Sequence, residues 1–202
     1  MDERRARIRE NLWRRLDRVC VAIEALHHRH NVSAVLRTAD ALGVHRVHLV
    51  EGHFKPSKGA ARGAERWLEI HHHTDAVTAL RAIRDSGYEV WCADLKPGAV
   101  SPSEVPVDRK ICLWFGAELV GVSPEVLAAA DGCITIPMLG FAQSLNVSVS
   151  AGMVLSDIAG RARALGREAL LSDEVRSVQL KAWMDREDEV MFRLHRRASK
   201  SS

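Results

Sequence analysis

Residues 133–153 combine polar side chains with the small residues that let a ligand approach the backbone. An apolar run of strand type ends at Pro137, a loop bends at Gly140, and Ser144 and Asn146 open a segment rich in serine, alanine and glycine. This combination is typical of the wall of a small-molecule site. A turn between two buried elements would use the same residue types, so these residues alone leave both interpretations open.

Two familiar phosphate-binding motifs are missing from the sequence. Gly116 and Gly121 have the glycine spacing of a P-loop, but no lysine followed by serine or threonine comes after them. No GxGxxG pattern follows any strand-like run. The sequence therefore supports neither a P-loop nucleotidase nor a standard dinucleotide-dependent dehydrogenase.

Histidines and cysteines raise the question of a metal site. The histidines cluster at 27–30 and 71–73, and the four cysteines are spread through apolar runs. Adjacent histidines on a strand point to opposite faces, and we expect no carboxylate or cysteine at ligand spacing beside them. We therefore expect no metal, and we expect the cysteines to be reduced core residues.

Positive charge is concentrated at the two ends of the chain. Residues 1–18 hold seven arginines against four acids, and residues 161–202 hold ten lysines and arginines against seven acids. The residues between them carry fifteen acids against twelve bases, and the whole chain has a net charge of +3. This distribution favours binding of a polyanion, and a pair of solvated basic helices is the alternative. The residues expected to contact the polyanion are Arg4, Arg5, Arg7, Arg9, Lys55, Lys58, Arg62, Arg161 and Arg163.

The size and composition are those of an ordinary globular protein. The chain has 202 residues, of which 47% are hydrophobic and 27% charged, so we expect one folded core rather than a disordered chain. No apolar run reaches the roughly 18 residues of a membrane-spanning helix, and the N-terminus lacks the apolar core of a signal peptide. We therefore expect a cytoplasmic protein.

Strand-like and helix-like segments alternate along the chain. Strands are expected at 19–26, 47–50, 66–72, 88–93, 110–115 and 133–136. Helices are expected at 2–18, between Asn31 and Gly43, between Thr74 and Gly87, from Pro124, at 145–165 and at 172–197, with Asn31, Thr74 and Ser123 as N-caps. Such alternation predicts an α/β fold with a mostly parallel sheet that helices cover on both faces.

Three segments resemble, in their order, the signature motifs of the SPOUT methyltransferases of the TrmH type. They are NVSAVLRTAD from Asn31, FGAELVG from Phe115, and IPMLG from Ile136 followed by QSLNVS from Gln143. The resemblance covers residues 19–160 and implies transfer of a methyl group from S-adenosylmethionine to a ribose 2′-hydroxyl of RNA. It also implies a homodimer, in which the second subunit completes each site. Finally, it implies a deep trefoil knot at the C-terminal end of the domain, which general topology rules would disfavour.

The same resemblance implies roles for individual residues. The expected catalytic residues are Asn31, Arg37, Glu118, Ser144 and Asn146. The expected cofactor contacts are Leu95, Gly116, Gly121, Ile136, Met138, Gly140 and Leu145. Because a guanidinium stays protonated up to about pH 12, we expect Arg37 to anchor a phosphate and polarise the hydroxyl rather than act as a base.

The basic ends resemble the extensions of family members that methylate guanosine 18 in the tRNA D-loop, so tRNA is the expected substrate. The expected division is a basic helix at 1–18, a methyltransferase domain at 19–165 and a basic helical extension at 166–202. The expected basic loop, residues 53–63 with Lys55, Lys58 and Arg62, is short for the family, and Leu119-Val120 replaces a charged position. Ribosomal RNA or another tRNA position therefore stays an alternative. A catalytically silent RNA-binding dimer is a third interpretation, which the presence of all the expected catalytic residues disfavours.

Overall fold

The computed structural model describes residues 2–24, 29–50, 63–117 and 120–198. The chain forms two compact units, which we call the sheet unit (Leu16–Ala169) and the terminal unit (Met1–Arg15 with Leu170–Ser202). The two ends of the chain thus belong to one unit, and the functional division into three segments stays a prediction. No helix among the described residues has both the length and the apolar content needed to cross a membrane.

The sheet unit is built on six parallel strands in the order β3-β2-β1-β5-β4-β6. The strands are β1 (Val19–Glu24), β2 (Arg46–Val50), β3 (Glu69–His73), β4 (Glu89–Ala93), β5 (Ile111–Phe115) and β6 (Gly132–Ile134). Every residue of the central strands β1 and β5 is buried, as expected for strands that are covered on both faces. The strand order reverses between β1 and β5, and ligands of such sheets bind outside the carboxyl ends of the strands near that point.

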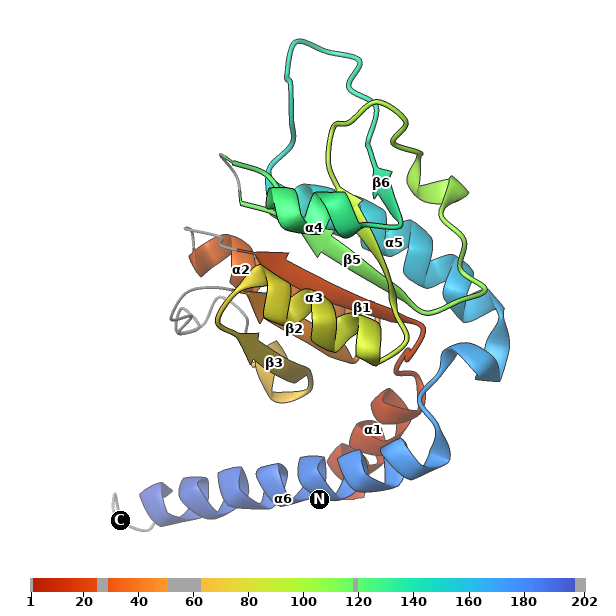
Figure 1. Cartoon of the computed structure of the whole chain (residues 1–202). Helices are drawn as coiled ribbons and strands as arrows, with labels where there is room; N and C mark the ends of the chain where they lie inside the picture. Colours follow the sequence, from red (N-terminus) through yellow and green to blue (C-terminus); the bar gives the residue numbers. More distant parts are fainter. Residues whose placement is uncertain (1, 25–28, 51–62, 118–119, 199–202) are drawn as a thin grey trace. The chain divides into compact units, whose positions relative to one another are not determined.

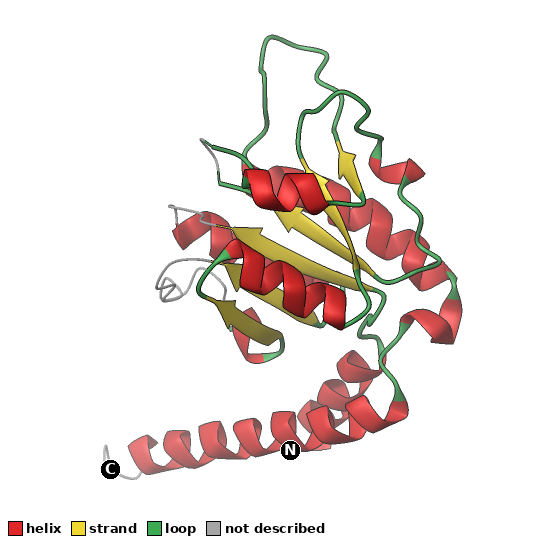
Figure 2. Ribbon diagram, in the orientation of Figure 1, coloured by secondary structure: helices red, strands yellow, loops and turns green. Residues whose placement is uncertain are grey.

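Helices cover both faces of the sheet, as Figures 1 and 2 show. α2 (Arg29–Ala41) packs against α5 (Val147–Ala164) on one face, and α3 (Ala76–Asp85) packs against α4 (Pro124–Ala129) on the other. The predicted α/β fold with a parallel sheet covered on two faces is therefore confirmed. The trefoil knot stays a prediction.

Several expected boundaries are wrong by a few residues. α2 already begins at Arg29, so Asn31 lies inside the helix instead of capping it. The N-cap of α3 is Asp75 rather than Thr74, because the Asp75 carboxylate accepts the Thr78 backbone N–H at 2.7 Å. Ser123 does precede α4, with Pro124 in the first helical position, although the serine side chain makes no capping hydrogen bond.

Four other elements differ from the sequence prediction. The strand expected at 66–72 is a short 3-10 helix (Ala64–Arg66) followed by β3, and β6 is confined to Gly132–Ile134. α5 begins at Val147, two residues after the expected start, because Asn146 is extended and acts as the N-cap. The first helix ends at Trp13, before the expected residue 18.

The terminal unit consists mainly of α1 (Asp2–Trp13) and α6 (Asp173–Ala198). The helical spacing of Ile8, Leu12 and Leu16 predicts an apolar face on the first helix, and Ile8 and Leu12 of α1 are buried. The sequence pattern predicts an apolar stripe on α6 through Val175, Val178, Ala182, Met191 and Leu194. Val178 does not fit this stripe, because it is 71% exposed, and the buried aromatic residue of the helix is Trp183. The guanidinium of Arg15 lies 5.2 Å from the centre of the Trp183 ring, so a cation covers the buried aromatic side chain.

Candidate active site

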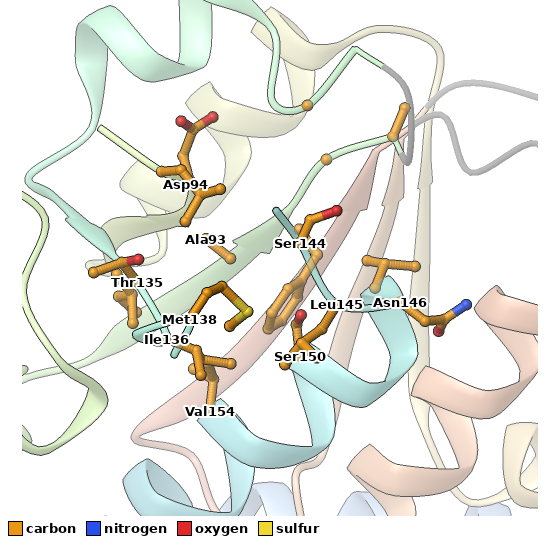
Figure 3. A pocket seen from close by; sticks show the side chains of 17 residues that line it. Ala93, Asp94, Thr135, Ile136, Met138, Ser144, Leu145, Asn146, Ser150 and Val154 are labelled. Carbon is orange, nitrogen blue, oxygen red and sulfur yellow. The ribbon is translucent and has the colours of Figure 1, made fainter. Parts of the chain in front are cut away.

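A cavity of about 490 Å³ opens at the carboxyl ends of β4, β5 and β6, beside the start of α5. Its lining comes from the residues that follow each of these strands and from the segment that leads into α5. Figure 3 shows Asp94 and Thr135 at one end of this lining and Asn146 at the other, with Met138 between them. Polar groups at the ends of a largely apolar wall are typical of a site for a small organic molecule.

Residues 116–122 leave β5 and lead to α4, and we call this segment the pocket loop. Its described residues Gly116, Ala117 and Gly121 form one wall of the cavity. Ala117 and Gly121 exchange two backbone hydrogen bonds of 2.9 Å, which close the loop on itself. A Cβ atom at Gly116 would collide with the backbone of Gly121 and Val122, so only glycine fits there. Gly121 has φ +74°, a conformation that residues with a side chain rarely adopt.

The first and third motif segments meet beside this cavity. The Asn146 side-chain N–H donates to the Asn31 side-chain carbonyl at 3.3 Å, and Asn31 is only 7% exposed. The Asn146 side-chain oxygen accepts the backbone N–H of Ser148 at 2.9 Å and its hydroxyl at 2.6 Å. These contacts hold the Asn146 amide in one orientation at the N-terminus of α5.

Arg37 does not line the main cavity. It is exposed on α2 and lines a second cavity of about 490 Å³, to which Gly152 and Ser156 of α5 also contribute. Ser144 and Asn146 line the first cavity. Glu118 lies outside the described residues, as do Lys55, Lys58 and Arg62.

Six of the seven expected cofactor contacts line the main cavity. They are Leu95, Gly116, Gly121, Ile136, Met138 and Leu145. Gly140 does not line it and is exposed. The sequence interpretation missed Asp94, Thr135, Ser150 and Val154, which line the cavity too. Asp94 could have been found, because it directly follows a predicted strand in an α/β pattern, where ligand-binding side chains concentrate.

The cysteines beside the cavity are poor nucleophiles. Burial, together with the neighbouring Cys133 and Asp94, raises the pKa of Cys92 to about 12. Burial and then Asp94 also raise the pKa of Cys133. Both thiols are therefore protonated at neutral pH, which agrees with a packing role rather than a catalytic one.

Several arginines expected to bind RNA already have partners within the protein. Arg4 donates to Glu187 at 3.0 Å and Arg5 donates to Asp188 at 2.7 Å. Arg161 donates to the Asp157 carboxylate at 2.8 Å and also to the carbonyl oxygens of Val105 and Pro102. The guanidinium of Arg163 donates to the Leu42 carbonyl oxygen at 2.9 Å. Arg7 and Arg9 are exposed on α1.

The histidines of β3 do have a carboxylate beside them, contrary to the sequence prediction. His71 Nε2 lies 3.1 Å from a Glu69 carboxylate oxygen, and His48 Nδ1 lies 2.9 Å from His73 Nε2. Even so, no group of three or more histidine, cysteine, aspartate or glutamate residues in the described part of the chain is arranged to hold a metal ion.

Comparison with known proteins defines the class. The model of the SpoU rRNA Methylase family matches residues 18–156, and the chain belongs to this family. The resemblance inferred from the three motifs is therefore confirmed.

Individual relatives extend this result. The chain is 42% identical over 156 residues to a tRNA (guanosine(18)-2′-O)-methyltransferase of Thermus thermophilus, which covers 76% of this chain and 80% of the relative. The solved TrmH/SpoU tRNA modifying enzyme of A. aeolicus superposes with a TM-score of 0.82 at 34% identity, over 92% of this chain and 97% of that one. An AdoMet-bound rRNA methyltransferase of Sinorhizobium meliloti superposes with a TM-score of 0.66 at 26% identity, over 82% and 61% of the two chains.

Proposed function

We propose that this protein transfers a methyl group from S-adenosylmethionine to the ribose 2′-hydroxyl of guanosine 18 in tRNA. The observation that carries the proposal is the 42% identity to an enzyme named for this reaction, over most of both chains. The meeting of the first and third motif segments beside a ligand-sized cavity supports it. Methylation of ribosomal RNA is the second candidate, because the Sinorhizobium meliloti relative is named an rRNA methyltransferase.

The lining of the main cavity fits S-adenosylmethionine. The cofactor carries an apolar-faced adenine, which suits Ile136, Leu145 and Val154, and cationic sulfonium and ammonium groups, which suit the Asp94 carboxylate. The pocket loop exposes backbone at Gly116 and Gly121, where a bulkier residue would fill the space. Bound there, the cofactor would supply an electrophilic methyl group. A cytoplasmic location and independence from metal ions stay predictions.

The protein's own task in this reaction is to align a ribose oxygen with the methyl group. Displacement at a methyl carbon is an in-line reaction, so correct positioning supplies much of the rate. We assign to Asn31, Ser144 and Asn146 the orientation of the target ribose. Glu118, outside the described residues, stays a predicted catalytic residue. Arg37 anchors the adjacent phosphate and polarises the hydroxyl, because its planar guanidinium suits two parallel hydrogen bonds to phosphate oxygens.

We also propose that the active form is a homodimer. Arg37 faces a cavity other than the one assigned to the cofactor, so a second copy of the chain could present its own Arg37 to the site. Leu139 and Phe141 are fully exposed on the segment between β6 and α5, which is unusual for large apolar side chains. Sedimentation equilibrium at micromolar concentration tests this, and a monomer that methylates RNA at full rate would contradict it.

The experiment that tests the reaction uses tritiated S-adenosylmethionine with purified RNA. Full-length tRNA transcripts should accept label, and a transcript with a 2′-deoxyguanosine at position 18 should not. Ribosomal RNA, incubated in parallel, should stay unlabelled. Label in ribosomal RNA alone would favour the second candidate, and no label in any RNA would favour a silent RNA-binding protein. Activity should survive chelation of divalent metals when polyamines keep the tRNA folded.

A further inference from the structure

Glu24 is a buried acid to which the proposed chemistry assigns no role. It is the last residue of β1, and it is only 4% exposed. Its Oε2 accepts a hydrogen bond of 2.7 Å from the indole N–H of Trp114 and one of 3.2 Å from the backbone N–H of Ser123. Burying a carboxylate costs free energy unless hydrogen-bond donors compensate the charge. The Trp114 and Ser123 donors provide this compensation for Glu24.

The two donors flank the pocket loop in the sequence. Trp114 is fully buried in β5, just before the loop begins, and Ser123 directly follows the loop as the N-cap of α4. Because a carboxylate oxygen has two lone pairs, one atom of Glu24 can hold both flanks at once. The loop is thus closed internally by Ala117 and Gly121 and tied to β1 at its base.

We propose that Glu24 is a positioning residue for the methyl-transfer site, an inference that rests on the proposed function. By holding both flanks of the pocket loop against β1, it fixes the cavity wall formed by Gly116, Ala117 and Gly121. Glu24 therefore acts through the loop and contacts neither cofactor nor RNA.

Three variants separate this role from a general contribution to stability. Glu24→Ala removes the acceptor, Glu24→Gln keeps an oxygen in a side chain of similar size, and Trp114→Phe removes one donor. We expect Glu24→Ala to weaken S-adenosylmethionine binding about tenfold, the effect of losing one well-formed hydrogen bond or slightly more. We expect Glu24→Gln to recover most of that affinity, and Trp114→Phe to lose about threefold. Affinity for tRNA should stay within about twofold of wild type, since the clamp touches no phosphate-binding group.

Tyr88→Phe is the matched control. Tyr88 is buried just before β4, at the opposite end of the sheet, and its hydroxyl donates to the Asp17 carbonyl oxygen at 2.7 Å. The Tyr88 hydroxyl also accepts a hydrogen bond of 2.9 Å from the Arg46 guanidinium. The control therefore loses contacts with two partners, as Glu24→Ala does, and should lower the thermal midpoint comparably. Its affinity for S-adenosylmethionine, measured by calorimetry, should equal that of wild type.

Hydrogen–deuterium exchange measures how well the backbone amides of the pocket loop are protected in the ligand-free protein. Under native conditions Glu24→Ala should exchange faster than wild type in peptides covering residues 115–123, whereas Tyr88→Phe should not. Unchanged exchange there in Glu24→Ala would overturn the positioning role, as would an affinity loss that Tyr88→Phe reproduces. If Glu24→Ala does not fold, Glu24→Gln and Trp114→Phe decide the question by the same two measurements. Failure of the wild-type protein to methylate tRNA would count against the proposed function alone.

Discussion

Two polar residues of α2 have different surroundings. Asn31 is buried and bonded to Asn146 beside the main cavity, whereas Arg37 is exposed and lines the second cavity. Their separation suits different tasks, because a rigid amide can orient a ribose and an exposed guanidinium can reach a phosphate. Because Arg37 is exposed, its side chain can be substituted without removing the buried contact between Asn31 and Asn146.

We expect Arg37→Ala to lower the methyl-transfer rate by about a hundredfold or more, the cost of removing one preorganised donor from a transition state. The fold and the affinity for S-adenosylmethionine should not change, since Arg37 is exposed and does not line the proposed cofactor cavity. Arg37→Lys keeps the charge but loses the two-donor fork, so it should recover little. Single-turnover methylation at saturating RNA and cofactor is the measurement. A near-wild-type rate for the alanine variant would move the role to Asn31 or Glu118.

Three histidines form a stack at the β2–β3 edge of the sheet. The ring centre of His48 lies 5.0 Å from that of His71 and 5.2 Å from that of His73. Burial, the two neighbouring histidines and Arg46 lower the pKa of His48 to about 3, although Glu69 opposes them. Burial also lowers the pKa of His73. Both rings are therefore neutral in the folded protein near pH 7.

We expect the folded state to lose stability as the pH falls below about 6.5, the ordinary pKa of histidine. The unfolded chain takes up a proton at His48 there, and the folded chain does not until about pH 3. The loss is at most about 1.4 kcal/mol per pH unit for each such proton. Urea unfolding at pH 7.5 and 5.5 measures it, above the range in which the depressed pKa of Glu69 matters. His48→Gln should show a smaller difference between the two pH values, and an unchanged difference would refute the assignment.

At the scale of elements, the two ends of the pocket loop are held close together. The Gly116 Cα atom lies against the backbone of Gly121 and Val122 at the other end of the loop. A side chain at position 116 would therefore collide with backbone atoms, which cannot move aside as a flexible side chain could. The internal pair of hydrogen bonds and the tie to Glu24 fix the remaining geometry. The loop wall is thus set before any ligand arrives, which lowers the entropic cost of binding.

We expect Gly116→Ala to abolish measurable S-adenosylmethionine binding, because the added methyl group forces the pocket loop open. Gly160→Ala is the control, since Gly160 is exposed on α5 with open space around its Cβ position. That control should bind cofactor normally and gain up to about 1 kcal/mol from the better helix former. Calorimetric titration with the cofactor distinguishes the two variants. Normal binding by Gly116→Ala would show that the loop does not form the cofactor wall.

The elements themselves were largely predictable from local patterns. Continuous apolar runs such as Ile111–Phe115 predicted buried strands, because strands covered on both faces need no polar alternation. The start of α5 was less certain, since Leu145, Val147 and Val149 alternate with polar residues as in a strand. Thr74 and Asp75 are both good caps, and only the backbone geometry selects the aspartate.

The arrangement of the site was harder to predict. The motifs identified the side chains, but not that Arg37 and Asn146 would line separate cavities, because that depends on how α2 and α5 pack. The roles of Glu24 and Asp94 were also missed. Both are single acids at strand ends, and no spacing in the sequence relates them to the pocket loop.

At the scale of the whole molecule, the arginines of the N-terminal helix differ in how far their charge is neutralised within the protein. Arg4 and Arg5 form ion pairs with acids of α6, so much of their charge is neutralised within the terminal unit. Arg7 and Arg9 are exposed on the same helix. A polyanion would therefore meet the second pair more readily than the first.

We expect the double variant Arg7→Gln with Arg9→Gln to weaken tRNA binding and to flatten its salt dependence, by up to ~0.9 in log–log slope per lost contact with duplex RNA. The variant Arg4→Gln with Arg5→Gln should change the slope less and lower the thermal midpoint more, because it breaks contacts between α1 and α6. Filter binding over a range of potassium chloride concentrations measures the slopes. Equal slopes for wild type and both variants would mean that these arginines form only a solvated face.

The pairing of the chain's two ends also constrains how the protein is made. Domains emerging from a ribosome generally fold from the N-terminus onward, but Ile8 and Leu12 are buried in a unit whose other helix begins at Asp173. The apolar face of the first helix therefore stays unpaired until α6 has been synthesised. A chain truncated after Ala169 would lack the helix that contacts α1 and would expose Ile8 and Leu12.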